Sequence, residues 1–267
     1  MRWLKVGAVV FGAVAITALG IDAADTLQGS RSTLLGQVIS HSEGACPKGM
    51  VEAPMAQTFT CVDAYEASTN SKCARQDPGN EIETQENIND PACASESKED
   101  AQPWRFITRE QANTACMRAG KRLPTAEEWH LFSVGTPDTG TACITNKSTF
   151  SLTGSNESCV SALGAYDAIG NVWEWVSDDV IEGQHKGRAL PASGYVSQVD
   201  SSGIAVLTSS QAAELFYKDY FWSSQTGAYG MIRGGFYGSK EDAGVYAIHA
   251  DTLPTTAGTA MGFRCVQ

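Results

Sequence analysis

The sixteen residues "GAYDAIGNVWEWVSDD" (164–179) combine a Gly-Asn turn, two tryptophans that flank a glutamate, and three aspartates. Their alternation predicts a β-strand around Trp173 and Trp175, because successive side chains of a strand point to opposite faces of a sheet. The two tryptophans then share a face that packs on a core, while Glu174 lies on the other face. Burying an ionised carboxylate is costly unless it is neutralised, so Glu174 needs a partner on its own face.

The composition indicates an acidic, loop-rich globular protein. Among the 267 residues, 30 aspartates and glutamates outnumber 19 lysines and arginines, and the formal net charge is -11. No run rich in lysine and arginine occurs, so nucleic acid is not expected as a partner. Only 18% of the residues are charged, while glycine, serine, threonine and alanine are abundant. This composition argues against a coiled coil or a disordered chain.

The N-terminal 25 residues are typical of an export signal or a signal anchor. Two basic residues precede a long apolar run, and acidic residues follow it. Residues 4–21 are close to the minimum length of a membrane-spanning helix, and the possible cleavage sites are poor. We therefore favour an uncleaved membrane anchor at 4–21 followed by a polar stalk at 26–45. Secretion after cleavage of residues 1–25 is the alternative, and both place the remaining chain outside the cytoplasm.

Eight cysteines on an exported chain predict disulfides. No Cys-x-x-Cys pair and no histidine cluster indicates a zinc or iron–sulfur site. Other connectivities remain open, but pairing between near neighbours favours Cys46–Cys61, Cys73–Cys93 and Cys143–Cys159, which leaves Cys116–Cys265. The last bridge would join an early helix to the C-terminal strand.

Two helices and two early strands are predicted from local signals. Capping boxes, Thr-x-x-Gln at 108–111 and Thr-x-x-Glu at 125–128, mark the beginnings of the two helices. The stretches "GMVEAP" (49–54) and "FTCVDAYEAS" (59–68) indicate short strands. The rest of the chain is interrupted by glycines and shows no long helical period, which predicts short, irregular strands.

Two polar excursions, 71–103 and 182–218, separate these elements, and the second contains a weak helical pattern near 211–219. The aromatic group "LFYKDYFW" (215–222) overlaps the end of this pattern. Tyrosine and tryptophan suit contacts with a carbohydrate or a protein, so this group is either a ligand platform or the core anchor of the excursion.

Four segments, in this order, carry a family resemblance: "GKRLPTAEEW" (120–129), "GAYDAIGNVWEWVSD" (164–178), "MIRGGFYG" (231–238) and "GFRCV" (262–266). Over about residues 46–267 the chain resembles the formylglycine-generating enzyme (sulfatase-modifying factor) family. The resemblance implies an α+β fold related to C-type lectins, with two main helices, short twisted sheets and much irregular loop. It also implies that both polar excursions are insertions in this domain.

The resemblance implies a structural calcium ion. Family members with this motif hold calcium through a side chain at the position of Asp167, main-chain oxygens at Gly170 and Val172, and the carboxylate at Glu174. Calcium takes about six to eight oxygen ligands and mixes carboxylates with carbonyls, so these residues suit it. The alternative is that Glu174 pairs with Arg233 or with a backbone amide.

The catalytic pattern of the family is broken in this chain. Its oxidases carry two cysteines shortly after the Arg-Gly-Gly segment, and these bind copper(I) and activate oxygen. The corresponding residues here are Ser239 and Gly244, and no cysteine lies between 160 and 264. A serine hydroxyl cannot replace a thiolate toward copper(I), so we expect a pseudoenzyme without copper. Arg233 and Arg264 are expected to brace loops rather than to contact a substrate.

The sequence therefore favours an extracytoplasmic binding module that is stabilised by calcium, braced by disulfides and devoid of formylglycine-generating activity. Its protein or glycan ligand is expected where the oxidases of the family hold substrate, around Phe236, Tyr237, Ser239, Tyr246 and His249. Two alternatives remain: an oxidase or other modifying enzyme with a rearranged site, and a structural subunit of a cell-envelope complex.

Overall fold

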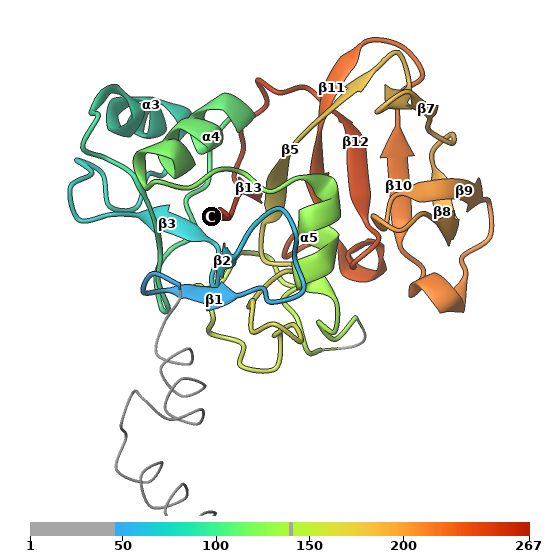
Figure 1. The fold of residues 1–267 in the computed structure, drawn as a ribbon, viewed down its shortest axis with the longest axis horizontal. Helices are drawn as coiled ribbons and strands as arrows, with labels where there is room; N and C mark the ends of the chain where they lie inside the picture. The colour runs from blue at the N-terminus through green and yellow to red at the C-terminus, as the bar shows by residue number, and fades with distance from the viewer. Residues whose placement is uncertain (1–45, 139–140) are drawn as a thin grey trace, which may run out of the picture. The chain divides into compact units, whose positions relative to one another are not determined.

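The computed structural model describes residues 46–138 and 141–267 (Figure 1). The predicted anchor at 4–21 and the stalk at 26–45 lie outside the described residues. Within the described part of the chain, no helix has both the length and the apolar character that crossing a membrane requires.

One nine-stranded sheet dominates the domain, in the order β7-β6-β5-β11-β12-β10-β8-β9, with β13 paired to β5 (Figure 1). Its strands are β5 (Trp173–Ile181), β6 (Gln184–His185), β7 (Arg188–Ala189), β8 (Gly194–Val199), β9 (Ala205–Ser209), β10 (Tyr220–Ser223), β11 (Ala228–Arg233), β12 (Ile248–Thr252) and β13 (Met261–Gly262). Two small sheets pair β1 (Met50–Glu52) with β2 (Cys61–Asp63), and β3 (Ala67–Thr69) with β4 (Ser95–Ser97). The main sheet therefore has more strands than the expected short twisted sheets suggested.

The described residues contain three helices, α3 (Glu81–Asn89), α4 (Arg109–Arg118) and α5 (Ala126–Ser133), and two 3₁₀ turns, η1 (Glu214–Phe216) and η2 (Lys240–Asp242). Both predicted capping boxes are confirmed, with Thr108 before α4 and Thr125 before α5. Helix α3 was not predicted, because its buried side chains, Thr84 and Asn87, are polar and form no apolar stripe. The weak helix expected near 211–219 is only the single turn η1.

Helices α4 and α5 cover opposite faces of β5. Trp173 and Trp175 belong to a core that also contains Ala112 and Ala115 of α4. Val176 and Val180 point the other way, into a core with side chains of α5. The alternation predicted for this strand is thus confirmed, and each face receives its own helix.

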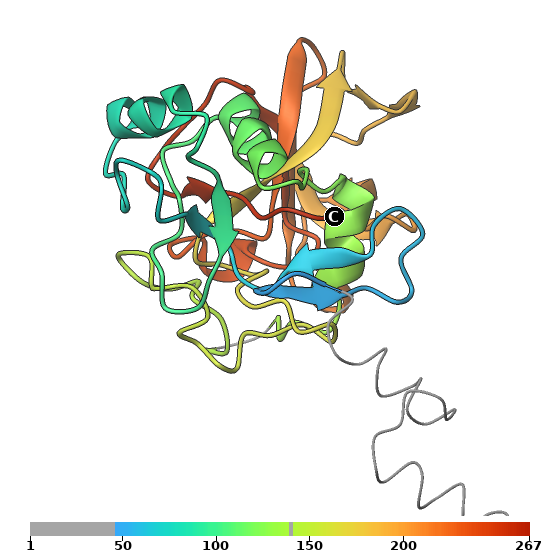
Figure 2. The same ribbon diagram turned by 60° about the vertical axis from the view of Figure 1, so that its left-hand side comes forward.

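Four disulfides brace the domain: Cys46–Cys61, Cys73–Cys93, Cys116–Cys265 and Cys143–Cys159. They join the pairs that the spacing of the cysteines favoured. Cys116 lies in α4, so the third bridge ties this helix to the C-terminal segment. The last residue, Gln267, exchanges backbone hydrogen bonds with Cys61 of β2. Figure 2 shows that the C-terminus lies within the fold. The C-terminus is therefore held in the fold from two sides.

The second polar excursion supplies β6, β7, β8 and β9 to the main sheet. The aromatic group at 215–222 divides between the core and the sheet surface. Phe221 is fully buried in the core, whereas its neighbours Tyr220 and Trp222 on β10 are half-buried and point to the opposite face.

Candidate functional site

Glu174 is buried on the α5 face of β5 and is neutralised by Arg264. Its carboxylate accepts hydrogen bonds from Nε and Nη2 of Arg264, the shortest at 2.6 Å, and from Nε1 of Trp129 at 2.7 Å. Arg264 is itself fully buried. The predicted need for a partner is confirmed, and that partner comes from the C-terminal "GFRCV" motif rather than being Arg233.

Arg233 has a bracing role of its own. Its guanidinium is fully buried, lies 4.7 Å from the ring of Trp129, and donates to the backbone carbonyls of Ala126, Ser202, Gly203 and Val245. Burial lowers the pKa of Arg233 to about 9. The side chain joins α5, the second excursion and the segment after β11.

Two further carboxylates lie buried near Glu174. Glu66 accepts hydrogen bonds from the Asn171 side chain and from the Val172 amide, and Asp167 accepts one from the Gly154 amide. Burial, with the charges of Asp167 and Glu174, raises the pKa of Glu66 well above its usual value. Burial also raises the pKa of Asp167 to about 6.

Three buried carboxylates thus face the single guanidinium of Arg264, and this excess of negative charge fits a divalent cation. The oxygens of Asp167, Gly170 and Val172 are also of the type that calcium prefers. Glu174 fits less well, because it already accepts four hydrogen bonds and would have to release one to bind the ion. Among the described residues, no three acidic, histidine or cysteine side chains converge on one metal position.

The backbone between Asp167 and Asn171 is tightly curled. Asp167, Gly170 and Asn171 have φ of 56°, 79° and 50°, in the left-handed region. A Cβ at Gly170 would overlap the carbonyl of Ile144, so this turn requires glycine there. The "GN" dipeptide that precedes the tryptophans therefore fixes the entry of β5.

The two positions that the resemblance aligns with the family's catalytic cysteines, Ser239 and Gly244, hold no thiol, and Gly244 has no room for a side chain. The Ser239 hydroxyl accepts a hydrogen bond from the Phe236 amide at 3.0 Å and closes a turn. At Gly244, an added Cβ would overlap both carboxylate oxygens of Asp219. Asp219 therefore occupies the space in which a side chain at 244 would begin. All eight cysteines of the chain are in disulfides.

The five residues predicted to bind ligand divide among separate places. Phe236 packs against the core on the α4 face, and the ring of Tyr237 lies edge-on to it at 5.0 Å. Tyr246 packs against the other core, with ring contacts to His130 and Phe216. Ser239 lines a cavity, whereas His249 belongs to a row of aromatic rings on the sheet.

This aromatic row, defined as Tyr195, Tyr220, Trp222 and His249, crosses three strands, β8, β10 and β12. Consecutive ring centroids are 5.1, 4.7 and 4.0 Å apart, and the rings of Trp222 and His249 are nearly parallel. All four side chains are half-buried. At one end the buried ring of Trp173 lies edge-on to His249, whose Nδ1 is 3.0 Å from Oδ1 of Asp251.

Sequence reasoning found only part of the row. His249 was named as a ligand residue, and the group at 215–222 contains Tyr220 and Trp222. Tyr195 lies in the second excursion and was missed. Its only sequence signal is an aromatic residue next to an apolar one in "GYV". Tyr195 lies beside Tyr220 because β8 pairs with β10, and the sequence does not show this pairing.

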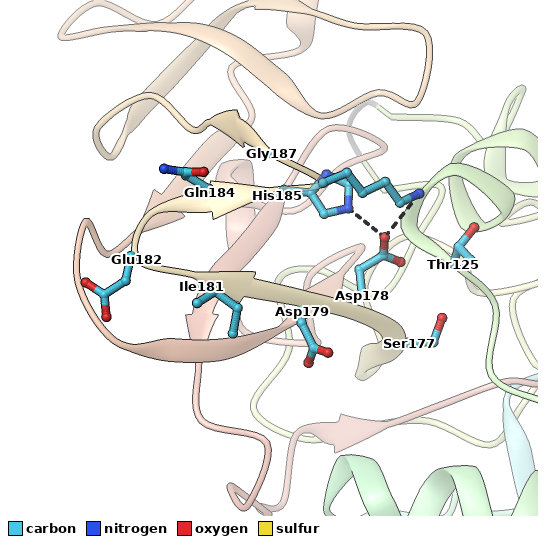
Figure 3. A pocket seen from close by; sticks show the side chains of 10 residues that line it. Thr125, Ser177, Asp178, Asp179, Ile181, Glu182, Gln184, His185 and Gly187 are labelled. Atoms are coloured by element: carbon cyan, nitrogen blue, oxygen red, sulfur yellow. Dashed lines mark hydrogen bonds and ion pairs between the residues drawn. The ribbon is translucent and has the colours of Figure 1, made fainter.

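A surface pocket of about 620 Å³ lies at the beginning of α5 (Figure 3). Oδ1 of Asp178 is 2.7 Å from Nε2 of His185 and 3.6 Å from Nζ of Lys186, while Oδ2 accepts from the Ala126 amide. Burial opposes ionisation of Asp178, but the hydrogen bonds from His185 and the helix outweigh it and lower the pKa. Ser177 does not point toward His185 (Figure 3), so the pocket offers no activated serine.

Comparison with known proteins gives one family and several remote structures. The family described as "Sulfatase-modifying factor enzyme 1-like domain" matches residues 59–267. No curated protein is significantly similar to the chain. The Major Tropism Determinant I1 Variant is 17% identical with a TM-score of 0.48, over 83% of this chain and 53% of that one. This chain thus spans about half the length of that protein.

Two other solved structures cover most of their own length. The crystal structure of CarF is 14% identical with a TM-score of 0.42, over 83% of this chain and 94% of that one. PvdO from Pseudomonas aeruginosa is 13% identical with a TM-score of 0.38, over 82% of this chain and 90% of that one.

Proposed function

Because the chain belongs to the sulfatase-modifying factor enzyme 1-like family, we propose that it is a binding module that has lost the oxidase chemistry of that family. The α+β fold expected for the family, related to C-type lectins, is confirmed, as is bracing by disulfides. Four disulfides indicate an extracytoplasmic protein. We infer that its ligand is a protein that docks on the aromatic row.

The overlap at Gly244 is the observation that supports loss of oxidase chemistry. Copper(I) needs soft thiolate ligands, and a cysteine at 244 would collide with the Asp219 carboxylate. The Ser239 hydroxyl is already used within its own turn. Restoring both cysteines would therefore not restore the copper site unless Asp219 were also replaced.

Copper titration tests this loss directly. We expect the purified protein to bind copper(I) no better than a Ser239→Ala variant and to consume no oxygen with a cysteine-containing peptide. Stoichiometric copper together with peptide-dependent oxygen uptake would instead establish the alternative of an oxidase with a rearranged site.

The aromatic row supports a protein ligand by its composition and shape. Tyrosine and tryptophan are enriched among residues that dominate the energy of protein interfaces. Each ring of the row presents apolar surface and carries a polar atom that can hydrogen bond at a wet interface. The row lies on a sheet face. It lines neither the pocket at the beginning of α5 nor the cavity beside Ser239. Small molecules bind mainly in concave sites, so this position favours a protein ligand.

The matched variants Trp222→Ala and Leu207→Ala test the docking surface. Leu207 is an exposed side chain on β9 outside the row. Extracellular proteins retained by the immobilised chain would be quantified by mass spectrometry, and candidates would be purified for titration. We expect a partner whose affinity falls about tenfold or more with Trp222→Ala and is unchanged with Leu207→Ala. Binding to purified glycans that depends on Trp222, with no such protein, would contradict a protein ligand.

We also propose a structural calcium ion held by Asp167, the carbonyls of Gly170 and Val172, and Glu174. The excess of buried negative charge supports it. Calcium present at about a hundredfold over its Kd would stabilise the native state by about 2.7 kcal/mol. Asp167→Asn is a cleaner probe than Glu174→Gln, because Glu174 also holds Arg264.

Thermal unfolding with calcium or with chelator, in wild type, Asp167→Asn and the exposed control Glu96→Gln, tests the ion. We expect calcium to raise the Tm of wild type and of the control. The Tm of Asp167→Asn should be the same with calcium and with chelator. Identical melting curves with calcium and chelator in wild type would remove the ion from this protein.

Membrane attachment through residues 4–21 remains a proposal that rests on the sequence. Expression of the full chain and of residues 26–267 behind a cleavable signal tests it. We expect only the full chain to sediment with membranes after a high-salt wash, and release of both into the soluble fraction would favour secretion.

A further inference from the structure

A cavity of about 660 Å³ lies next to the turn of Ser239 and has acidic walls. Four carboxylates line it, from Asp138, Glu214, Glu241 and Asp242, against two lysines, Lys218 and Lys240. One lysine is already used, since Lys218 lies 3.4 Å from Glu214 in an exposed pair. The cavity therefore carries net negative charge and has the size of a site for a small organic ligand.

Asp138 is the most deeply buried of the four wall carboxylates. Its Oδ2 accepts a hydrogen bond from the Val245 amide at 3.0 Å. Among the described residues, no lysine, arginine or histidine forms an ion pair with it. Burial raises the pKa of Asp138 to about 7. A carboxylate in this environment gains stability from any cation that reaches it.

Asp219 provides a second, fully buried carboxylate behind the same wall. Its Oδ2 accepts from the Tyr246 amide at 2.7 Å, one residue after the amide that Asp138 binds. Its Oδ1 is buried and has no hydrogen-bond partner among the described residues. Burial, and then the charge of Asp138, raise its pKa well above the usual value. A buried carboxyl oxygen without a hydrogen-bond partner is costly, so Oδ1 indicates a missing partner.

The nearest cation does not supply that donor. The charge of Arg233 acts on Asp219, but the Arg233 guanidinium donates its hydrogen bonds to backbone carbonyls. The two carboxylates are thus held in place by consecutive amides of the segment that follows Gly244, without a cationic partner. Asp219 fills the space beside Gly244, which aligns with the second catalytic cysteine of the family's oxidases.

We propose that this cavity binds an organic cation, an ammonium or guanidinium group, which enters past Ser239 and pairs with Asp138, with Asp219 adding negative potential behind it. The volume is far larger than a bare metal ion needs, and no three acidic side chains in the described residues converge on a metal position. The group could belong to a basic side chain of a protein or to a free polyamine. The cavity shares no lining residue with the aromatic row, so this inference does not depend on the proposed docking surface.

Calorimetric titration of the purified protein tests the proposal with three probes: a capped Ala-Lys-Ala peptide, the same peptide with norleucine in place of lysine, and spermidine. We expect the lysine peptide to bind and the norleucine peptide not to bind. Binding of spermidine as well would show that an amine is sufficient. Binding of the peptide alone would assign the cation to a protein side chain, and both results support the proposal.

Two variants and one control make the test specific. Asp138→Asn keeps the acceptor oxygen for the Val245 amide but removes the charge, and should weaken binding by about tenfold or more. Asp242→Asn, on the same wall, should weaken it less, and the exposed Glu96→Gln should leave it unchanged. Thermal melts identify any variant that is unfolded.

Three outcomes overturn the proposal. The first is that neither cationic probe binds. The second is that a folded Asp138→Asn variant binds as tightly as wild type. The third is that calcium chloride binds in a manner that depends on Asp138 while both amines fail, which would make the cavity a metal site.

Discussion

At the scale of single residues, the fold depends on how each buried charge is compensated. Glu174 and Arg264 are both inaccessible to solvent and are joined by bidentate hydrogen bonds. A buried pair of this kind contributes little net stability, since the attraction repays the loss of hydration. Removing one member leaves the other charged and unpaired, and that state is strongly unfavourable.

Arg264→Met is therefore expected to lower the free energy of unfolding by about 3–5 kcal/mol. The double variant Arg264→Met/Glu174→Gln should recover part of this loss, because no charge is then left buried. The comparison variant is Arg188→Met, which breaks a half-exposed pair with Asp200 and should cost about 1 kcal/mol or less. Urea unfolding measures all three, and equal losses for Arg264→Met and Arg188→Met would contradict the burial argument.

Gly244→Ala tests the contact between this backbone and Asp219. The added methyl group would overlap the Asp219 carboxylate, so we expect a loss of about 1–3 kcal/mol, as for other overpacked sites. In an Asp219→Ala background, Gly244→Ala should lower the free energy of unfolding by less than it does in wild type. Gly258→Ala meets only the Met261 side chain near 4 Å and serves as the control. A neutral Gly244→Ala in thermal unfolding would show that Asp219 does not fill this space.

At the scale of elements, α5 is anchored to the sheet by its first turn. Thr125 and Glu128 form its capping box, and Asp178 of β5 accepts the amide of its first residue. Trp129 donates to Glu174 from the next turn. The alternation of β5 supplies both carboxylates, because residues 174 and 178 lie on the same face of the strand.

Asp178→Asn should destabilise the protein at pH 7 by about 1–3 kcal/mol, since hydrogen bonds to a charged acceptor are lost. The pKa of Asp178 is lowered in the folded state. Its contribution is therefore present above the pKa of the unfolded chain and disappears as pH falls through the folded-state pKa. The difference from wild type should shrink below about pH 4. The control, Asp179→Asn, affects a side chain that is 60% exposed and should change little.

At the scale of the whole molecule, the C-terminal segment closes the domain. Cys265 bonds to α4, Arg264 to Glu174, and Gln267 to β2. The bridge Cys116–Cys265 spans 149 residues, and Cys143–Cys159 spans 16. A longer loop loses more chain entropy in the unfolded state when it is closed.

Replacing both cysteines of each bridge with alanine compares the two loops within one protein. The chain-entropy relation gives a loss of about 5 kcal/mol for Cys116–Cys265 and about 3 kcal/mol for Cys143–Cys159. All four cysteines are buried, so the cost of the cavities is similar. A larger loss for the short loop, measured by thermal unfolding, would show that local strain or packing outweighs loop length.

The buried acids predict an unusual pH dependence for the molecule. Burial raises the pKa of Asp138 to about 7 and of Asp167 to about 6, and it raises the pKa values of Glu66 and Asp219 well above their usual values. Through these four acids the native state binds more protons than the unfolded state between about pH 4 and pH 7, which lowers stability as pH rises through this range. His130, whose pKa burial lowers to about 4, acts in the opposite direction, but the four acids outnumber it.

Denaturant unfolding between pH 5 and pH 8, in the presence of chelator, checks this slope. Asp138→Asn should reduce the slope of stability against pH. The slope should not vanish, because Asp219 and Asp242 remain near position 138 and Arg233 offsets only part of their negative charge. Glu96→Gln, at an exposed position, should leave the slope unchanged. Stability that rises from pH 6 to pH 8 would show that these acids are ionised in the native state.

Features that depend on neighbours along the chain could be predicted from the sequence. Alternation placed Trp173 and Trp175 on one face and Glu174 on the other, and the threonine boxes marked where α4 and α5 begin. Short spacing favoured three of the disulfides. Helix α3 escaped prediction because it is held by polar contacts without an apolar period. Local signals of this kind arise from hydrogen bonds and side-chain directions within a few residues.

Tertiary structure alone decided which distant residues meet. Arg264 lies 90 residues from the glutamate that it neutralises, and Asp219 fills the space beside Gly244 from another strand connection. Tyr195 joins Trp222 and His249 only because β8, β10 and β12 are neighbours in the sheet. The order of the strands and the contacts of the C-terminal segment bring these residues together. The periodicity of a single segment does not determine either, because the energy of pairing two strands depends on surfaces from distant parts of the chain.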